Sequence, residues 1–262
     1  IGIFSDNNQI SSPSLRILLQ LVIFIIFIIF TNLNLIDLRT DFLNELLNIK
    51  LISIIFTTFC ILVLVNGTNF LDGLNTLVVG YYILICSFLL VLSNNYHLII
   101  NDNIILLLIF LIVVYLFNFF GKFYLGDSGS YLISFYMAYF VIEFVLNNQS
   151  VSPYLICLFL WYPAFENLFT IIRRFNSKKS IHLPDQTHLH QMLYKFFINS
   201  KMINYKIVNS FSANLINIFN FIIFVVFYKY YNETNVLVCA ITINIFLYLI
   251  LYYLLKKKLI KY

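Results

Sequence analysis

The stretch VNGTNFLDGLNTL, residues 65–77, stands between two long apolar runs at about 51–70 and 74–93. Each run is long enough to cross a bilayer as an α-helix, which takes about 20 residues. An amide or carboxylate placed in lipid costs several kcal/mol unless a partner satisfies it. The stretch nevertheless holds three asparagines, one aspartate and two glycines. This concentration of polar groups at the edge of a membrane span indicates a functional site.

The whole chain has the composition of an integral membrane protein. Of its 262 residues, 61% are hydrophobic and 10% are charged, against roughly 45–50% and about 25% in globular proteins. We expect an all-α polytopic fold, a single transmembrane domain over residues 1–262 with a cytoplasmic loop at 173–211. The apolar runs predict about eight transmembrane helices, at roughly 15–36, 51–70, 74–93, 103–120, 129–147, 153–172, 212–230 and 235–255.

The distribution of basic residues predicts the orientation. If the N-terminus is cytoplasmic, eight spans return the C-terminus to the cytoplasm. Of the sixteen Lys and Arg residues, only Arg39, Lys50 and Lys229 then lie outside, which leaves thirteen on the cytoplasmic side. That asymmetry is typical of membrane proteins. The basic residues flank spans and build no separate basic domain, so nucleic-acid binding is not expected.

The same orientation places four polar segments on the cytoplasmic face. They are SDNN at 5–8, the stretch at 66–75, YLGDSGS at 124–130 and IHLPDQTHLHQML at 181–193. The topology rests on lysine and arginine alone, so the polar segments are an independent observation. Their gathering on one face favours a shared site.

In the second segment, Asn66, Asn69 and Asp72 recur every three residues, so on a helix they drift around one face. Gly67 and Gly73 allow a close approach or a break. The alternative is a plain helix–loop–helix turn in which Asp72 caps the next span.

In the third segment, Gly126-Asp127-Ser128-Gly129 opens the fifth span. Asp127 or Ser128 as a helix cap is one interpretation. The other is a carboxylate ligand for a hard cation such as Mg2+, which takes one or two carboxylates and leaves positions for phosphate oxygens. The glycines would let a phosphate approach the backbone at the helix N-terminus.

In the fourth segment, His188 and His190 flank Leu189, and an extended backbone would point both rings one way. They could serve a metal, a phosphate or a proton, or be incidental in a solvated loop. Arg173 and Arg174 end the sixth span, where they could snorkel to headgroups or clamp a diphosphate.

Glu166 lies inside the same predicted span as these arginines. It precedes Arg173 by seven residues, two turns along one helix face. We therefore expect Glu166 to orient the arginines.

Taken in order, these segments resemble the polyprenyl-phosphate N-acetylhexosamine-1-phosphate transferases, glycosyltransferase family 4 in its membrane phosphosugar sense. NGTNFLDGLNTL is similar to the family's N-x-x-N-x-x-D-G-x-D/N-G-L motif, and FGKFYLGDSGS to its G-D-x-G-S motif with a preceding aromatic residue. PDQTHLHQML resembles the P-D-x-x-H-I/L-H-H/Q loop. IGIFSDNNQISSPSLRILLQ resembles the acidic motif that leads into SPxLRLL. Four motifs in one order make the resemblance specific.

The resemblance implies transfer of a sugar 1-phosphate, by default GlcNAc-1-phosphate, from a UDP-aminosugar to a polyprenyl phosphate such as undecaprenyl phosphate. UMP is released, and a cell-surface polysaccharide or wall polymer is begun. It implies an Mg2+-dependent enzyme, with Mn2+ as a substitute, in the bacterial inner membrane with its active site facing the cytoplasm. A homodimer is a further expectation.

The resemblance also assigns residues. The expected catalytic residues are Asp6, Asp72, Asp127, His188 and His190. The expected substrate-binding residues are Asn66, Asn69, Asn75, Tyr124 and Arg174. Asp127 would bind the metal with Asn69 as a neutral second ligand, and Tyr124 would stack on uracil. Asp72 would contact the nucleotide or support the metal, and Asp6 would be the base or would position the acceptor. A lipid-side groove would take the polyprenyl tail.

The sequence departs from the family pattern at four places. Ser5 stands where the family has a first acid, Asn75 where many members have an acid, and Thr76 where they have glycine. Gln191 replaces a last histidine, as in the polysaccharide-initiating branch. Members have roughly ten spans and this chain begins with Ile1, so we expect an N-terminally incomplete chain that lacks the first few.

Two other functions remain open. Ser5 motivates a catalytically impaired member that acts as a binding or assembly partner. A transporter of lipid-linked sugars would also have many spans, but it predicts polar residues near the bilayer midplane and an inverted repeat. The polar motifs of this chain gather at one face instead.

Overall fold

The computed structural model describes residues 1–176, 187–201, 203–205 and 207–259. All regular secondary structure in these residues is helical. The elements are α1 (Gly2–Asp6), α2 (Pro13–Thr31), α3 (Asp41–Leu47), α4 (Lys50–Leu71), α5 (Leu77–Tyr96), α6 (Asn103–Phe119), α7 (Gly126–Asn147), α8 (Pro153–Phe159), α9 (Trp161–Asn176), α10 (Leu189–Ser200), α11 (Val208–Phe227), the 3-10 turn η1 (Tyr228–Tyr230) and α12 (Thr234–Leu259).

The all-α polytopic prediction is confirmed, with a smaller span count. In the described residues, six helices are long and apolar enough to cross a membrane: α2, α4, α5, α7, α11 with η1, and α12. The predicted span at 153–172 is a pair, α8 and α9, bent by 72°, which would make a seventh. Helix α6 is apolar but has 17 residues. Each of the eight predicted runs therefore corresponds to a helix or a bent pair, and six or seven qualify as spans.

The bend between α8 and α9 follows from Pro163. Proline has no N–H, so it cannot donate to the carbonyl of Phe159 four residues earlier. The hydroxyl of Tyr81 on α5 donates to that carbonyl instead, at 2.8 Å. The break is thus satisfied by a neighbouring helix, as lipid requires.

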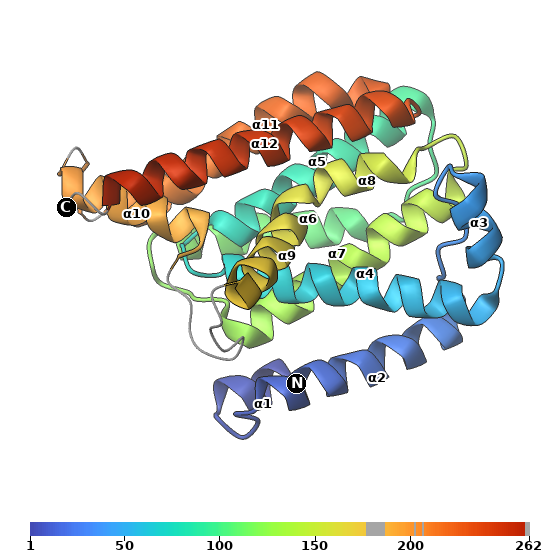
Figure 1. Ribbon diagram of the computed structural model, residues 1–262, viewed down its shortest axis with the longest axis horizontal. Helices are drawn as coiled ribbons and strands as arrows, with labels where there is room; N and C mark the ends of the chain where they lie inside the picture. The colour runs from blue at the N-terminus through green and yellow to red at the C-terminus, as the bar shows by residue number, and fades with distance from the viewer. Residues whose placement is uncertain (177–186, 202, 206, 260–262) are drawn as a thin grey trace.

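Helix α4 lies at the centre of the bundle. It packs against α2, α7 and α9, while α5 packs against α6 and α11, and α12 against α8 and α10. In Figure 1, α2 runs along one side of the bundle and α11 and α12 run along the opposite side. The α4–α9 contact depends on Gly67, because an added Cβ would lie 2.2 Å from the carbonyl oxygen of Pro163.

The two ends of the bundle differ in chemistry. At the end that holds α3, loops bind one another through backbone groups: Asn148 receives the Ile99 N–H and donates to the Ile99 carbonyl, both at 2.7 Å. Arg39 reaches the carbonyl of Val151 at 3.3 Å. The described parts of the polar segments that were predicted to share a face lie at the other end, with α1 and α10 (Figure 1).

Gly67→Ala should destabilise the bundle, because its methyl group would overlap the Pro163 carbonyl oxygen and push α4 from α9. Overpacking of this kind costs typically 1–3 kcal/mol. The thermal unfolding midpoint of detergent-solubilised protein is the measurement. Gly129→Ala is the matched control, since its Cβ would meet the Leu125 side chain at 3.0 Å and no backbone outside its helix. Equal midpoints for Gly67→Ala and the wild type would contradict the expectation.

Candidate functional site

The N-terminus of α7 is capped from another segment. The carboxylate of Asp6 accepts the backbone N–H groups of Asp127 (2.9 Å) and Ser128 (3.0 Å), and also the Ser128 hydroxyl. Gly126 has φ +61°, and a Cβ there would lie 3.1 Å from Asp6 Oδ1, so the position requires glycine. Burial raises the pKa of Asp6, but the bonds from Ser128 and Asp127 and the charge of Arg16 outweigh it and lower that pKa overall.

The capping role that the sequence offered to Asp127 or Ser128 is thus filled by Asp6. The sequence suggested that the backbone N–H groups at this helix N-terminus bind a phosphate. In this structure they donate hydrogen bonds to the Asp6 carboxylate. The Asp127 side chain is turned toward other partners.

The Asp127 carboxylate is the centre of a polar cluster. Its Oδ1 accepts from the Asn69 amide at 2.6 Å, and its Oδ2 accepts from Arg16 at 2.7 Å and from the Ser5 hydroxyl. Arg16 also donates to Ser5 Oγ at 2.7 Å. Asn69 is held in place by a second bond to Ser130, at 3.1 Å. The cluster joins α1, α2, α4 and α7 around a side chain that keeps 24% of its surface exposed.

Asp72 completes a group of three carboxylates. It follows the last residue of α4, and the backbone N–H of Gly126 lies close enough to oppose the effect of burial on its pKa. Burial raises the pKa of Asp72 to about 7, and the charges of Asp127 and Asp6 act in the same direction. Asp72 does not cap the next span, because α5 begins at Leu77 after Thr76 and has no side-chain cap. The plain-turn alternative is therefore wrong for this residue.

The turn that carries Asn75 is held by asparagines. The Asn75 N–H donates to Asn209 Oδ1 at 2.7 Å. The next residue, Thr76, stands at the position where the resembled motif has glycine, and it takes a left-handed φ of 72°. A left-handed threonine costs about 1–3 kcal/mol and persists only where its surroundings impose it. Here the Thr76 N–H donates to Asn118 Oδ1, and its Oγ1 and carbonyl accept from the amides of Asn214 and Asn217.

Sequence reasoning missed these four asparagines. Three of them, Asn209, Asn214 and Asn217, belong to α11, and Asn118 belongs to α6. Polar amides inside otherwise apolar runs were a signal that could have found them, because lipid tolerates such groups only when they are bonded.

The two histidines stack with nearly parallel rings, 5.5 Å between centroids and 15° between planes. His188 precedes α10 with an extended backbone, and His190 lies in its first turn. A Cβ on Gly73 would lie 2.9 Å from His190 Nε2, so the glycine beside Asp72 lets the helix approach. His190 is buried, its ring nitrogens have no hydrogen-bond partner in the described residues, and burial followed by the His188 charge lowers its pKa well below the ordinary value.

The remaining predicted residues lie at different distances from this centre. Tyr124 is 70% exposed, and its hydroxyl and the Asn75 amide flank Gly121. Arg174 is buried near the end of α9. Asn66 sits one turn deeper in α4 than Asn69 and donates to Gln20 at 2.9 Å. The first part of the histidine segment, 181–186, lies outside the described residues.

Glu166 does not behave as expected. Its carboxylate is buried and lies 2.9 Å from His188 Nδ1, while its other oxygen accepts the Tyr248 hydroxyl at 2.8 Å. The expectation that it orients the arginines is replaced by a pairing with histidine.

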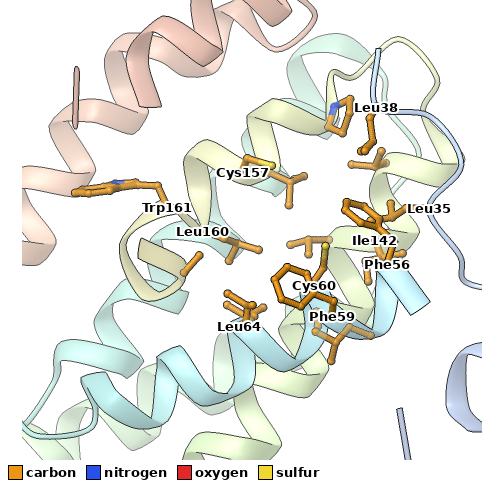
Figure 2. A pocket seen from close by; sticks show the side chains of 18 of the residues that line it. Leu35, Leu38, Phe56, Phe59, Cys60, Leu64, Ile142, Cys157, Leu160 and Trp161 are labelled. Atoms are coloured by element: carbon orange, nitrogen blue, oxygen red, sulfur yellow. The ribbon is translucent and has the colours of Figure 1, made fainter. Parts of the chain in front are cut away.

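Two apolar cavities reach toward the polar end. One, of about 330 Å³, lies among α4, α7, α8 and α9, with Cys60, Leu64, Leu160 and Trp161 around it (Figure 2). The other, of about 580 Å³, lies between α1, α2 and α7 and includes Ser128, which donates to Asp6.

Comparison with known proteins finds relatives of this sequence. The profile of glycosyl transferase family 4 matches residues 1–145. A probable undecaprenyl-phosphate N-acetylglucosaminyl 1-phosphate transferase of Bacillus subtilis is 26% identical over 207 residues, 77% of this chain and 57% of its own length. An undecaprenyl-phosphate alpha-N-acetylglucosaminyl 1-phosphate transferase of Thermotoga maritima is 28% identical over 97 residues, 37% of this chain and 32% of its own.

The chain thus spans 57% or less of the length of these relatives. No solved structure matches it significantly. Because the family profile covers more than half of the chain, and the matched part contains Asp6, Asn69, Asp72 and Asp127, the chain belongs to glycosyl transferase family 4.

Proposed function

We propose that the protein transfers a sugar 1-phosphate, GlcNAc-1-phosphate by default, from a UDP-sugar to a polyprenyl phosphate and releases UMP. The names of the two relatives support the acceptor and the transferred group. The observation that carries the proposal is the convergence of Asp6, Asp72 and Asp127 with Asn69 and Arg16 at one end of a membrane bundle. The product would begin a cell-surface polysaccharide or wall polymer.

The charges of the site suit this reaction. Donor diphosphate and acceptor phosphate are both anionic, so cationic groups must screen their approach. Arg16 supplies one such group beside Asp127. An oxygen of the acceptor phosphate forms the new bond to the sugar-bearing phosphorus, and the bond to UMP breaks. A phosphate monoester has a second pKa near 6, so no strong base is needed, and Asp6 would position the acceptor or take its remaining proton.

Mg2+, or Mn2+ in its place, is the proposed cofactor. No group of three or more His, Cys, Asp or Glu side chains in the described part of the chain could hold a metal. Mg2+ needs only one or two carboxylates when phosphates supply further oxygens, so the Asp127 carboxylate with the Asn69 amide oxygen fits it. The ion would neutralise the diphosphate charge.

The other residues would hold the substrates. Tyr124 would stack on uracil, and Asp72 and Asn75 would contact the nucleotide beside it. His188, His190 and Arg174 would bind phosphate and sugar oxygens. The cavity that includes Ser128 would receive the first isoprene units of the acceptor, because it joins the apolar faces of α2 and α7 to the carboxylate of Asp6. Asn66 would support the site through Gln20.

The proposed setting is the bacterial plasma membrane, with the polar end of the bundle and both ends of this chain in the cytoplasm. The positive-inside distribution supports that orientation. A homodimer is proposed with it.

Membranes that carry the protein should transfer label from carbon-14 UDP-GlcNAc into butanol-extractable lipid, and only when Mg2+ is present. Asp127→Asn should reduce transfer by at least 100-fold, because the site loses its central negative charge and the carboxylate proposed to bind Mg2+. Asp102→Asn is the matched control and should keep full transfer, because Asp102 directly precedes α6, at the end of that helix away from the site.

The other outcomes of this assay are also informative. If only a different UDP-aminosugar labels the lipid, the proposed substrate is wrong and the proposed reaction stands. Silence with every donor would contradict the transferase and favour the impaired member, and Ser5→Asp would then be the first variant to try.

Tyr124→Ala should raise KM for the UDP-sugar and leave kcat close to that of the wild type. Stacking of a base on an aromatic side chain contributes about 1–3 kcal/mol, which corresponds to roughly 5- to 150-fold in KM. Tyr205→Ala, at a tyrosine that is 77% exposed elsewhere, is the control. An unchanged KM would remove Tyr124 from the nucleotide site.

A further inference from the structure

Glu166 is buried at 0% exposure and is approached by three donors from two segments. His188 Nδ1 lies 2.9 Å from its Oε1, and the Leu189 backbone N–H is 3.4 Å from the same oxygen. The Tyr248 hydroxyl of α12 donates to Oε2 at 2.8 Å. Thus α9 supplies the carboxylate, the residue that precedes α10 supplies the histidine, and α12 supplies the tyrosine.

We propose that Glu166, braced by Tyr248, is a positioning residue that holds His188 with its proton on Nδ1 and presents Nε2, which then only accepts hydrogen bonds, to a hydroxyl of the sugar or to the remaining P–OH of the acceptor phosphate. This inference rests on the proposed function for the identity of the ligand. The placement of the ring and its proton does not depend on the reaction.

The proton assignment follows from the donor inventory around the carboxylate. An ionised carboxylate only accepts hydrogen bonds, a backbone N–H only donates, and Tyr248 fills the second oxygen with its own proton. His188 therefore has to donate from Nδ1, which leaves Nε2 as its remaining polar atom. A carboxylate behind a histidine fixes the ring orientation and the tautomer in this way.

Glu166 lies among apolar side chains, so its carboxylate needs His188 as a hydrogen-bond partner. Phe165, Phe169 and Tyr162 all pack around Tyr248, so the carboxylate lies in an apolar region where an unpaired charge would be costly. His188 also stacks on His190, and its Nδ1 lies 3.4 Å from Thr170 Oγ1, a second and more distant acceptor for the same proton. Arg173 reaches the same hydroxyl at 3.4 Å.

The arrangement also gives the last helix a role in the site. Tyr248 lies 82 residues from Glu166 in the sequence. Its hydroxyl binds the Glu166 carboxylate, which in turn holds the His188 ring. A change in α12 can therefore alter the placement of this ring in the site.

The direct test is the tautomer of His188 in detergent-solubilised protein labelled with 15N-histidine. The chain has four histidines, and His188→Gln identifies the resonances of interest. The wild type should show a protonated Nδ1 at His188. Glu166→Leu should give a mixture of the Nδ1 and Nε2 tautomers, because it removes the carboxylate that accepts the Nδ1 proton, while the His190 resonances keep their wild-type pattern.

Transfer activity provides the second readout. Glu166→Gln should lower kcat/KM by at least 10-fold, as loss of a supporting partner commonly does, and Tyr248→Phe by a smaller factor of about 3- to 10-fold. Tyr162→Phe is the matched control: its hydroxyl is equally buried beside Tyr248 but has no hydrogen-bond partner in the described residues. It should stay within twofold of the wild type.

A wild-type tautomer at His188 in Glu166→Leu, or equal effects of Tyr248→Phe and Tyr162→Phe, would overturn the proposal. If Glu166→Leu fails to fold, Tyr248→Phe carries both measurements. If the wild type transfers no sugar phosphate at all, the proposed function fails, while the 15N spectrum still decides the placement of the His188 proton.

Discussion

The first backbone N–H groups of a helix have no partner inside the helix, and the site is assembled on those of α7. Asp6 accepts the N–H groups of Asp127 and Ser128, and Asp72 lies near that of Gly126. Negative charge is favoured at this end of a helix. Two segments far apart in the sequence are thereby fixed to one helix end. Asp127, in the first turn, is left to face Asn69 and Arg16.

A second constraint sets the depth of the site. Polar groups can lie below the membrane surface only if protein partners satisfy them. The asparagines of α6 and α11 do so for the turn at Asn75 and Thr76, and the Tyr81 hydroxyl does so at the broken helix. At both places a neighbouring helix supports the polar backbone through its amide or hydroxyl side chains.

The sequence was sufficient to predict the apolar helices and the gathering of the polar motifs at one end, because hydropathy and local motifs are both written in short stretches. It did not reveal Arg16 beside Asp127, the asparagines around Thr76, or the pairing of Glu166 with His188 and Tyr248. These contacts join residues up to 141 positions apart. They depend on how helices rotate about their axes, which apolar runs do not specify. The bend at Pro163 was not predicted either, although a proline in the middle of the predicted span 153–172 was a signal for it.

Thr76 has a consequence for how the nucleotide end of the site is prepared. Glycine visits the left-handed region readily in an unfolded chain, whereas threonine is restricted there and elsewhere. Once three asparagine side chains hold Thr76 in that conformation, the turn has few alternative shapes to adopt. The loss of backbone freedom then occurs during folding and not when a ligand arrives. The Asn75 loop is in this sense pre-organised, and a rigid donor could dock on it without first ordering the chain.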